Sequence, residues 1–241
     1  SNVMLSLGDN ATGVITEGGA ATQLSPGIWV GSLTEILPEK GYWLILDAEG
    51  TLTIYDGIPS ESLVYDLHSG PNLISFPSSG SAEVGNALPD DIEGSITGII
   101  TEGGAATQIA PGMWVGSLSE FEGGMGYWVV SDDAISFSYD LSTLSRSNIV
   151  YKEEKLDGYE YTQSSKQAFY FVESIEGISN GDYILSFNGD NLIGSRQWQS
   201  SIIDVPAMGN DGNSYSNGYM KAGDTPIFKL LSNGKITTLE G

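Results

Sequence analysis

The stretch TGVITEGGAATQ at residues 12–23 is followed by PGIWVGSL at 26–33 and by GYW at 41–43. All three strings return 85 residues later (97 − 12 = 85), as TGIITEGGAATQ, PGMWVGSL and GYW. We call residues 12–43 repeat 1 and residues 97–128 repeat 2; 22 of their 32 paired positions are identical. Copies this similar predict one structural module built twice, with a core that tolerates Val/Ile and Ile/Met exchanges.

Short apolar runs between Gly-rich breaks predict strands joined by tight turns, and the chain contains 32 glycines. In repeat 1 and just after it, the expected strands are 12–17, 28–33, 41–46 and 51–55, and residues 20–24 are expected to be a short strand or coil. Repeat 2 is preceded by a segment, 63–77, that predicts two strands around a Ser69-Gly70 turn. Residues 81–88 predict one short helix, with Ser81 as its cap and Pro89 as its stop.

The repeat pattern ends near Ser142, and a polar linker is expected at 145–165. Beyond it, two Asn-Gly dipeptides, Asn188-Gly189 and Asn233-Gly234, predict hairpin turns between apolar runs. The expected strands are 168–172, 181–187, 192–198, 225–231 and 236–239.

These patterns predict an all-β protein of tandem small β-sandwich-like modules: module 1 (residues 1–60), module 2 (61–143) and a different C-terminal β-sandwich (144–241). Module 1 has no counterpart of segment 63–77, so we expect it to be N-terminally incomplete. A sheet that lacks a strand exposes unpaired backbone groups, which favours pairing with another chain.

Charge and composition exclude several function classes. The net charge is −22, from 31 acidic and 9 basic residues, which argues against nucleic acid and anionic membranes as partners. Such a surface is either simply solvated or holds divalent cations loosely. The chain has no cysteine and one histidine, His68, so thiolate zinc sites and cysteine nucleophiles are excluded. No apolar run has the length of a membrane span, so no membrane insertion is expected. The start at Ser1 carries no signal peptide and suits a mature or excised piece.

Two longer patterns are similar to known modules. The string GPNLISFP (70–77), followed by GYW (126–128), resembles a β-rich repeat of very large secreted proteins of marine Bacteroidetes that use the type IX secretion route. The pattern GDYI (181–184), GSRQW (194–198), DVPAMGNDG (204–212) and GDTPIFK (223–229) resembles a companion β-sandwich module of the same proteins. The resemblance implies an extracellular or cell-surface location. It implies no activity, since such modules are generally of unknown function.

Aromatic side chains are candidates for stacking on sugar rings. We consider Trp198, Tyr215 and Tyr219 as ligand-binding residues, beside a rim of acidic and Asn side chains. The alternative is that Trp and Tyr fill the core of a small sandwich. For the other four tryptophans, which recur between the repeats in apolar strands, the core is the expected place.

The loop at 208–215 is rich in Asn, Asp and Gly and has oxygen ligands at alternate positions, as calcium loops do. The candidate calcium ligands are Asp190, Asn210, Asp211, Asn213 and Asp224. The loop lacks the full EF-hand spacing, and a turn held by Asx hydrogen bonds is the alternative. No other cofactor is expected.

The sequence offers no catalytic constellation. The acidic pairs at 90–91, 132–133 and 153–154 are adjacent, so on a strand they point to opposite faces, whereas glycosidase carboxylates must face each other across a sugar. His68 is expected to be structural or solvated. We therefore expect a non-enzymatic extracellular structural protein whose copies assemble into a filament or surface layer by strand donation. The alternatives are a carbohydrate-binding adhesin module with glycan partners, and an accessory domain of a secreted hydrolase.

Overall fold

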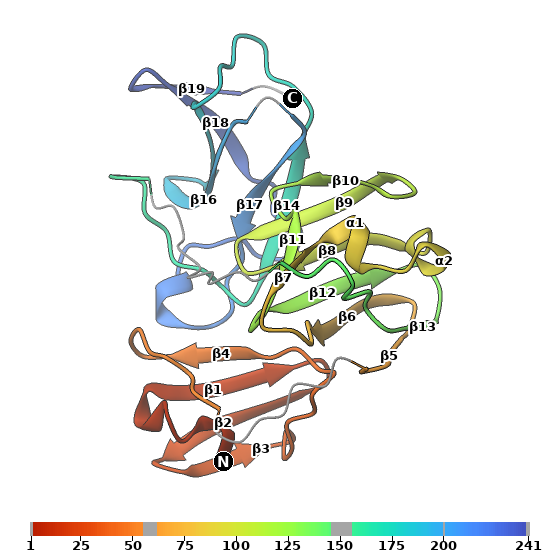
Figure 1. The fold of residues 1–241 in the computed structure, drawn as a ribbon. Coiled ribbons are helices and arrows are strands. Elements are labelled where there is room, and N and C mark those ends of the chain that lie inside the picture. The colour runs from red at the N-terminus through yellow and green to blue at the C-terminus, as the bar shows by residue number, and fades with distance from the viewer. Residues whose placement is uncertain (1, 55–61, 146–155, 200, 240–241) are drawn as a thin grey trace. The chain divides into compact units, whose positions relative to one another are not determined.

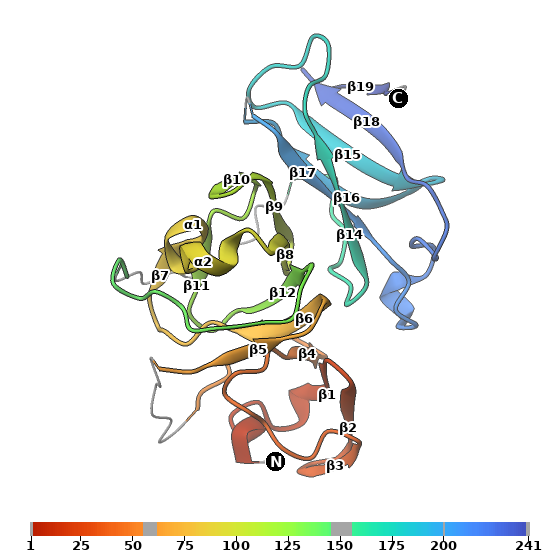
Figure 2. The same ribbon diagram turned by 90° about the vertical axis from the view of Figure 1, so that its right-hand side faces the viewer.

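The computed structural model describes residues 2–54, 62–145, 156–199 and 201–239. The chain divides into two compact units (Figures 1 and 2). Unit 1 comprises residues 1–101, 110–112 and 120–149. Unit 2 comprises residues 102–109, 113–119 and 150–241.

Repeat 1 forms an antiparallel four-stranded sheet. Its strands are β1 (Ala11–Thr16), β2 (Gly19–Ser25), β3 (Ile28–Gly31) and β4 (Trp43–Leu46). They are hydrogen-bonded in the order β3-β2-β1-β4, and Figure 1 shows them side by side in red and orange. Two short 3-10 helices, η1 (Asn2–Met4) and η2 (Gly8–Asn10), precede the sheet, and Met4 and Leu7 pack with Val14 in its core.

Repeat 2 has strands at the same offsets: β8 (Ile96–Thr101), β9 (Gly104–Ala110), β10 (Met113–Gly116) and β12 (Gly126–Ser131). Their order, β10-β9-β8-β12, is that of repeat 1, with β6 (Gly70–Ser75) added beyond β12. The local geometry matches as well. The Thr16 hydroxyl donates to the Gly41 carbonyl at 2.8 Å, and that of Thr101 to the Gly126 carbonyl at 3.0 Å.

One glycine is required at the same place in both repeats. Gly31 has a φ of 145° and Gly116 a φ of 130°, where side chains are strained. A Cβ on Gly31 would lie 2.1 Å from the Ala20 carbonyl oxygen, and one on Gly116 2.2 Å from that of Ala105. The paired glycines therefore let two strands approach closely at the last residue of β3 and of β10.

The remainder of unit 1 surrounds an aromatic core. It contains β5 (Tyr65–Leu67), β7 (Ser81–Glu83), α1 (Val84–Ala87), α2 (Asp90–Glu93), β11 (Glu120–Glu122) and β13 (Ile135–Phe137). The pairs β11-β7 and β13-β5 are antiparallel. Buried rings from these elements pack on one another, with Tyr139 at the centre of contacts to Tyr65, Phe76, Phe121 and Phe137.

The strands of the C-terminal part form two packed sheets, which we call the C-terminal sandwich (residues 156–239). They are β14 (Gln167–Val172), β15 (Tyr183–Asn188), β16 (Asn191–Gln197), β17 (Ile203–Met208), β18 (Ile227–Ser232) and β19 (Lys235–Thr238), with η3 (Ser214–Ser216) between β17 and β18. One sheet is β14-β17 and the other is β16-β15-β18-β19. Ile184, Trp198 and Val205 form a core with Phe228 against it. Both predicted Asn-Gly turns are present.

The all-β class is confirmed, and two local predictions are wrong. Residues 51–54 form no strand: their aligned strand β13 pairs with β5, and no β5 counterpart precedes repeat 1 in the described chain. Residues 81–88 contain β7 before α1, whose N-cap is Glu83 rather than Ser81. Strand β17 lies in a segment for which no strand was expected. Much of the predicted linker, residues 146–155, lies outside the described residues.

Candidate functional site

The edge of the repeat 1 sheet is the first element of the candidate site. Among the described strands, β4 pairs with β1 only. Its counterpart β12 pairs with β8 on one side and with β6 on the other, from Gly126↔Ser75 to Ser131↔Gly70. The position that β6 fills beside repeat 2 thus has no described strand beside repeat 1.

The backbone of β4 shows which of its groups face that open edge. The Ile45 carbonyl accepts a hydrogen bond from the Thr12 hydroxyl of β1 at 3.2 Å, and the Asp47 amide donates to the Asn10 carbonyl at 3.0 Å. Odd-numbered residues therefore point their backbone groups toward β1. Since alternate residues of a strand point to opposite edges, the amide of Leu44 faces outward.

Repeat 2 supports this assignment. Val129 is aligned with Leu44, and its carbonyl accepts a hydrogen bond from the side-chain amide of Asn72 in β6 at 3.5 Å. The backbone of Val129 therefore faces β6. The same face of Leu44 is the one that an added strand would meet.

A cavity in repeat 1 is the second element. It has a volume of about 540 Å³ and is lined mainly by apolar side chains, together with the charged side chain of Glu35. Met4, Val14, Trp29, Leu33 and Ile36 also line it. This size is typical of a binding pocket, and the exposed residues Val30 and Glu35 in its lining leave it open to solvent.

The corresponding region of repeat 2 is filled. Phe121, aligned with Ile36, is 0 % exposed and contacts the rings of Phe76, Tyr127 and Tyr139 at 5.6, 4.8 and 5.0 Å between centroids. Tyr139 is 5 % exposed, whereas its aligned residue, Ile54, is 58 % exposed. The difference follows from segment 62–77, because it supplies β6, Tyr65 and Phe76 to repeat 2.

Repeat 1 also contacts the outer edge of β6, within unit 1. The Gly41 amide donates to the Leu73 carbonyl at 3.1 Å, and the Ser75 amide donates to the Glu39 carbonyl at 3.2 Å. Glu17 adds a side-chain contact, since its carboxylate accepts from the Leu73 amide at 3.3 Å and lies 2.5 Å from His68 Nε2. The hydrogen bond to Glu17, and then the Ser69 carbonyl, raise the pKa of His68 above its ordinary value.

The His68–Glu17 contact predicts that the stability of the contact between repeat 1 and β6 depends on pH. A histidine with a raised folded pKa stabilises most below its unfolded pKa of about 6.5, and this contribution is lost as pH rises through the folded value. An NMR titration of the single His ring should give a midpoint above that of the unfolded chain, and Glu17→Gln should lower it. The control is Glu102→Gln, at the aligned position of repeat 2. Equal midpoints in wild type and Glu17→Gln would contradict the assignment.

The predicted calcium loop is closed by its own hydrogen bonds. Asp211 accepts from the Asn213 amide at 3.0 Å, from the Ser216 hydroxyl at 2.8 Å and from the Tyr215 hydroxyl. Although burial raises the pKa of Asp211, these hydrogen bonds together hold it well below its ordinary value. Burial, and then the hydrogen bond to Asp211, raise the pKa of Tyr215 to about 12.

The other candidate ligands have separate roles in the described structure. Asn210 accepts from the Gly212 amide at 3.0 Å and Asp224 from the Lys221 amide at 2.8 Å. Asp190 lies in the β15–β16 turn. Within the described ranges, no three His, Cys, Asp or Glu side chains form a group that would hold a metal ion. Calcium binding by this loop remains a prediction.

The three candidate sugar-binding aromatics do not share a surface. Trp198 is 7 % exposed and packs with Ile184 and Val205. Tyr219 is 7 % exposed, belongs to a different core cluster, and donates its hydroxyl to the Thr162 carbonyl at 3.0 Å. Tyr215, at 39 %, is the exposed member of the three.

The acidic pairs lie in separate elements. Asp90 and Asp91 begin α2, and Asp132 and Asp133 follow β12. The pair at 153–154 lies outside the described residues. The described pairs thus show no opposed carboxylates.

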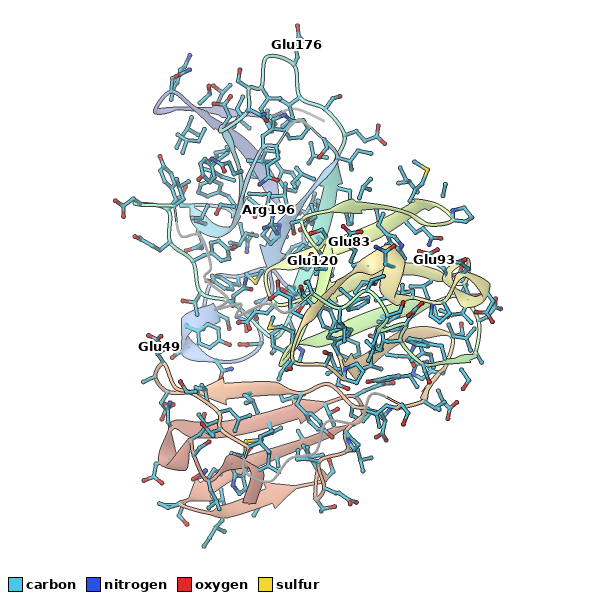
Figure 3. The ribbon with its side chains drawn as sticks, in the orientation of Figure 1. Glu49, Glu83, Glu93, Glu120, Glu176 and Arg196 are labelled. Carbon is cyan, nitrogen blue, oxygen red and sulfur yellow. The ribbon has the colours of Figure 1, made fainter. Side chains whose placement is uncertain are left out.

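Sequence reasoning missed a buried ion pair in unit 2. Asp204 of β17 is 0 % exposed, and its carboxylate lies 2.8 Å from an Arg196 guanidinium nitrogen of β16. Arg196, labelled in Figure 3, also donates to the Gly103 carbonyl at 2.5 Å. The Ser117 amide and hydroxyl both donate to Asp204, the hydroxyl at 3.0 Å.

This network joins the β9–β10 hairpin of repeat 2 to the C-terminal sandwich. Burial raises the pKa of Asp204, and the charge of Arg196 and the hydrogen bonds from Ser117 oppose that rise. A signal was present in the sequence, because an acidic residue between Ile203 and Val205 in an apolar run requires a buried partner.

Comparisons with known proteins assign the chain to no family. No protein family, curated protein or solved structure matches the chain. In the described part of the chain, no helix has the length and apolar character needed to span a membrane.

Proposed function

We propose that this protein is a non-enzymatic structural subunit that assembles with copies of itself through repeat 1. A strand of a neighbouring chain pairs with the open edge of β4. Heterologous contacts of this kind propagate into filaments or layers, because each added subunit presents a new open edge.

The observation that carries the proposal is the contrast between two copies of one module. Repeat 2 has β6 beside β12 and Phe121 in a filled core. In repeat 1, β4 is an edge strand. Ile36, which is aligned with Phe121, lines a cavity of about 540 Å³. An open, partly apolar edge favours pairing with another chain.

The chain has edge strands of its own that can act as donors. β14 pairs only with β17 among the described strands, and its Tyr170 and Phe171 are each 36 % exposed. β19 pairs only with β18, and all four of its residues are exposed. A neighbouring copy therefore offers a β-strand edge without a second protein.

The extracellular location belongs to the same proposal and is supported by the resemblance to secreted β-rich modules. The alternative of a sugar-binding adhesin gains no support from the burial of Trp198 and Tyr219. A broad glycan array is its direct test, with Tyr215→Ala as the variant that should lose binding.

Blocking the edge of β4 should prevent assembly. Leu44→Pro removes the outward amide and leaves the β1–β4 hydrogen bonds in place, whereas Leu44→Val keeps the amide and matches Val129 of repeat 2. We expect wild type and Leu44→Val to form oligomers or fibres in sedimentation velocity and negative-stain microscopy, and Leu44→Pro to remain dispersed. Wild-type protein that stays monomeric at every concentration, or equal assembly by both variants, would contradict the proposal.

A further inference from the structure

The two repeats present the same hairpin in two different environments. In repeat 2, Ala105 is 1 % exposed, and Gly103, Val115 and Ser117 are partly covered. In repeat 1, all four aligned residues are exposed: they are Gly18, Ala20, Val30 and Ser32. Identical residues are thus covered in one copy and open in the other.

The backbone of the two hairpins is equivalent, so the difference is not one of local fold. The Leu33 amide donates to the Ala20 carbonyl at 3.1 Å, and the Leu118 amide donates to the Ala105 carbonyl at the same distance. Gly31 and Gly116 take similar positive φ values. The β2–β3 hairpin therefore offers the same amide, hydroxyl and carbonyl groups as β9–β10.

Unit 2 shows the chemistry that recognises this hairpin. Arg196 donates to the Gly103 carbonyl, and Asp204 accepts from the Ser117 amide and hydroxyl. The groups aligned with these acceptors and donors in repeat 1 are the Gly18 carbonyl and the backbone and side chain of Ser32. A module with an arginine beside an aspartate on adjacent strands is complementary to both hairpins.

We propose that the β2–β3 hairpin of repeat 1 is the docking surface for the C-terminal sandwich of a neighbouring copy of this chain. The sandwich leaves the β9–β10 hairpin of its own chain and binds the aligned hairpin of the next. The Arg196–Asp204 network forms the same contacts with either hairpin. The exchange therefore costs little free energy, as in domain swapping. The proposal rests on the proposed function, because strand pairing at β4 is what brings the neighbour to repeat 1.

The charge distribution favours head-to-tail over head-to-head contact between copies. Residues 1–143 carry 19 of the 31 acidic side chains and a single basic one, Lys40. The other eight Lys and Arg residues lie in 144–241. Residues 1–143 have a net charge of −18 (1 − 19) and residues 144–241 a net charge of −4 (8 − 12). Repulsion between copies is therefore weaker when the C-terminal part of one chain meets the N-terminal part of the next than when two N-terminal parts meet.

Aspartate at the two aligned serines tests the exchange in the full-length chain. Ser117→Asp places a carboxylate against Asp204 and should release the sandwich from its own hairpin; Ser32→Asp blocks the open hairpin at an exposed site. We expect Ser117→Asp to associate at a concentration at least tenfold lower than wild type in sedimentation velocity. Ser32→Asp/Ser117→Asp should lose that gain. Equal association of a folded Ser117→Asp and the double variant would overturn the proposal.

Amide hydrogen exchange on wild type decides the matter if Ser117→Asp does not fold. The Ser32 amide should become as protected as that of Ser117 when the chains assemble, and an unprotected Ser32 amide in assembled protein would overturn the exchange. Leu44→Pro tests strand pairing at β4, whereas Ser32→Asp tests the exchange of the sandwich, so the two variants separate the two proposals. Assembly that depends on Leu44 but is insensitive to Ser32→Asp leaves the strand pairing in place and removes the exchange.

Discussion

Replacing Arg196 by alanine should lower the free energy of unfolding of unit 2 by roughly 3–5 kcal/mol, because it leaves a buried charge without its partner. Asp204 is fully buried, and Arg196 supplies its counter-charge at 2.8 Å. The loss is measured by urea unfolding followed through tryptophan fluorescence, to which Trp198 in the core of the same unit contributes.

Two controls separate the charge effect from a general loss of contacts. Lys235→Ala removes an exposed cation from β19 and should change stability by less than about 0.5 kcal/mol. The double variant Arg196→Met/Asp204→Leu should recover most of the stability, since an apolar pair of similar volume often replaces a buried ion pair at no cost.

The loss of unfolding free energy in Arg196→Ala should depend on pH because of Asp204. A carboxyl whose folded pKa is raised binds its proton more tightly in the folded state, so the folded state gains stability as pH falls toward the unfolded pKa. Without Arg196 the pKa of Asp204 should rise further, because the opposing charge is gone. The difference in unfolding free energy between wild type and Arg196→Ala should therefore shrink as pH is lowered. A difference that stays constant with pH would contradict a charge-based origin.

Truncating Phe121 should be the second large effect, about 3–5 kcal/mol for Phe121→Ala. The side chain is fully buried and its ring contacts three others. Ile36→Ala, at the aligned position of repeat 1, should cost less than half as much, because Ile36 already lines a cavity. Thermal unfolding of both variants measures the difference. Equal losses would show that the core of repeat 1 is as well filled as that of repeat 2.

The repeat made much of the fold predictable from sequence. Apolar periodicity and Gly-rich turns located the strands of both repeats, and the two Asn-Gly turns located the C-terminal hairpins. The strand expected at 51–55 failed for a tertiary reason: β13 exists because β5 pairs with it, and residues 51–54 have no such partner in the described chain. Local sequence carries no information about an absent neighbour.

The candidate site was less predictable. The expectation of an open edge in repeat 1 came from the missing copy of segment 63–77, but the cavity and the exposure of Ile54 depend on which side chains pack together. Strand β17 was missed because Asp204 and Pro206 interrupt its apolar pattern, and only the fold brings Arg196 to that aspartate. Composition could not tell that Trp198 and Tyr219 are buried while Tyr215 is exposed.

The most direct test of assembly through repeat 1 is amide hydrogen exchange at Leu44, compared between dilute and concentrated wild-type protein. The outward amide of an edge strand exchanges rapidly in water and slowly once a second strand accepts its hydrogen bond. We expect strong protection of Leu44 in the assembled protein and little in the dispersed protein. A Leu44 amide that exchanges equally fast in both states would contradict the account.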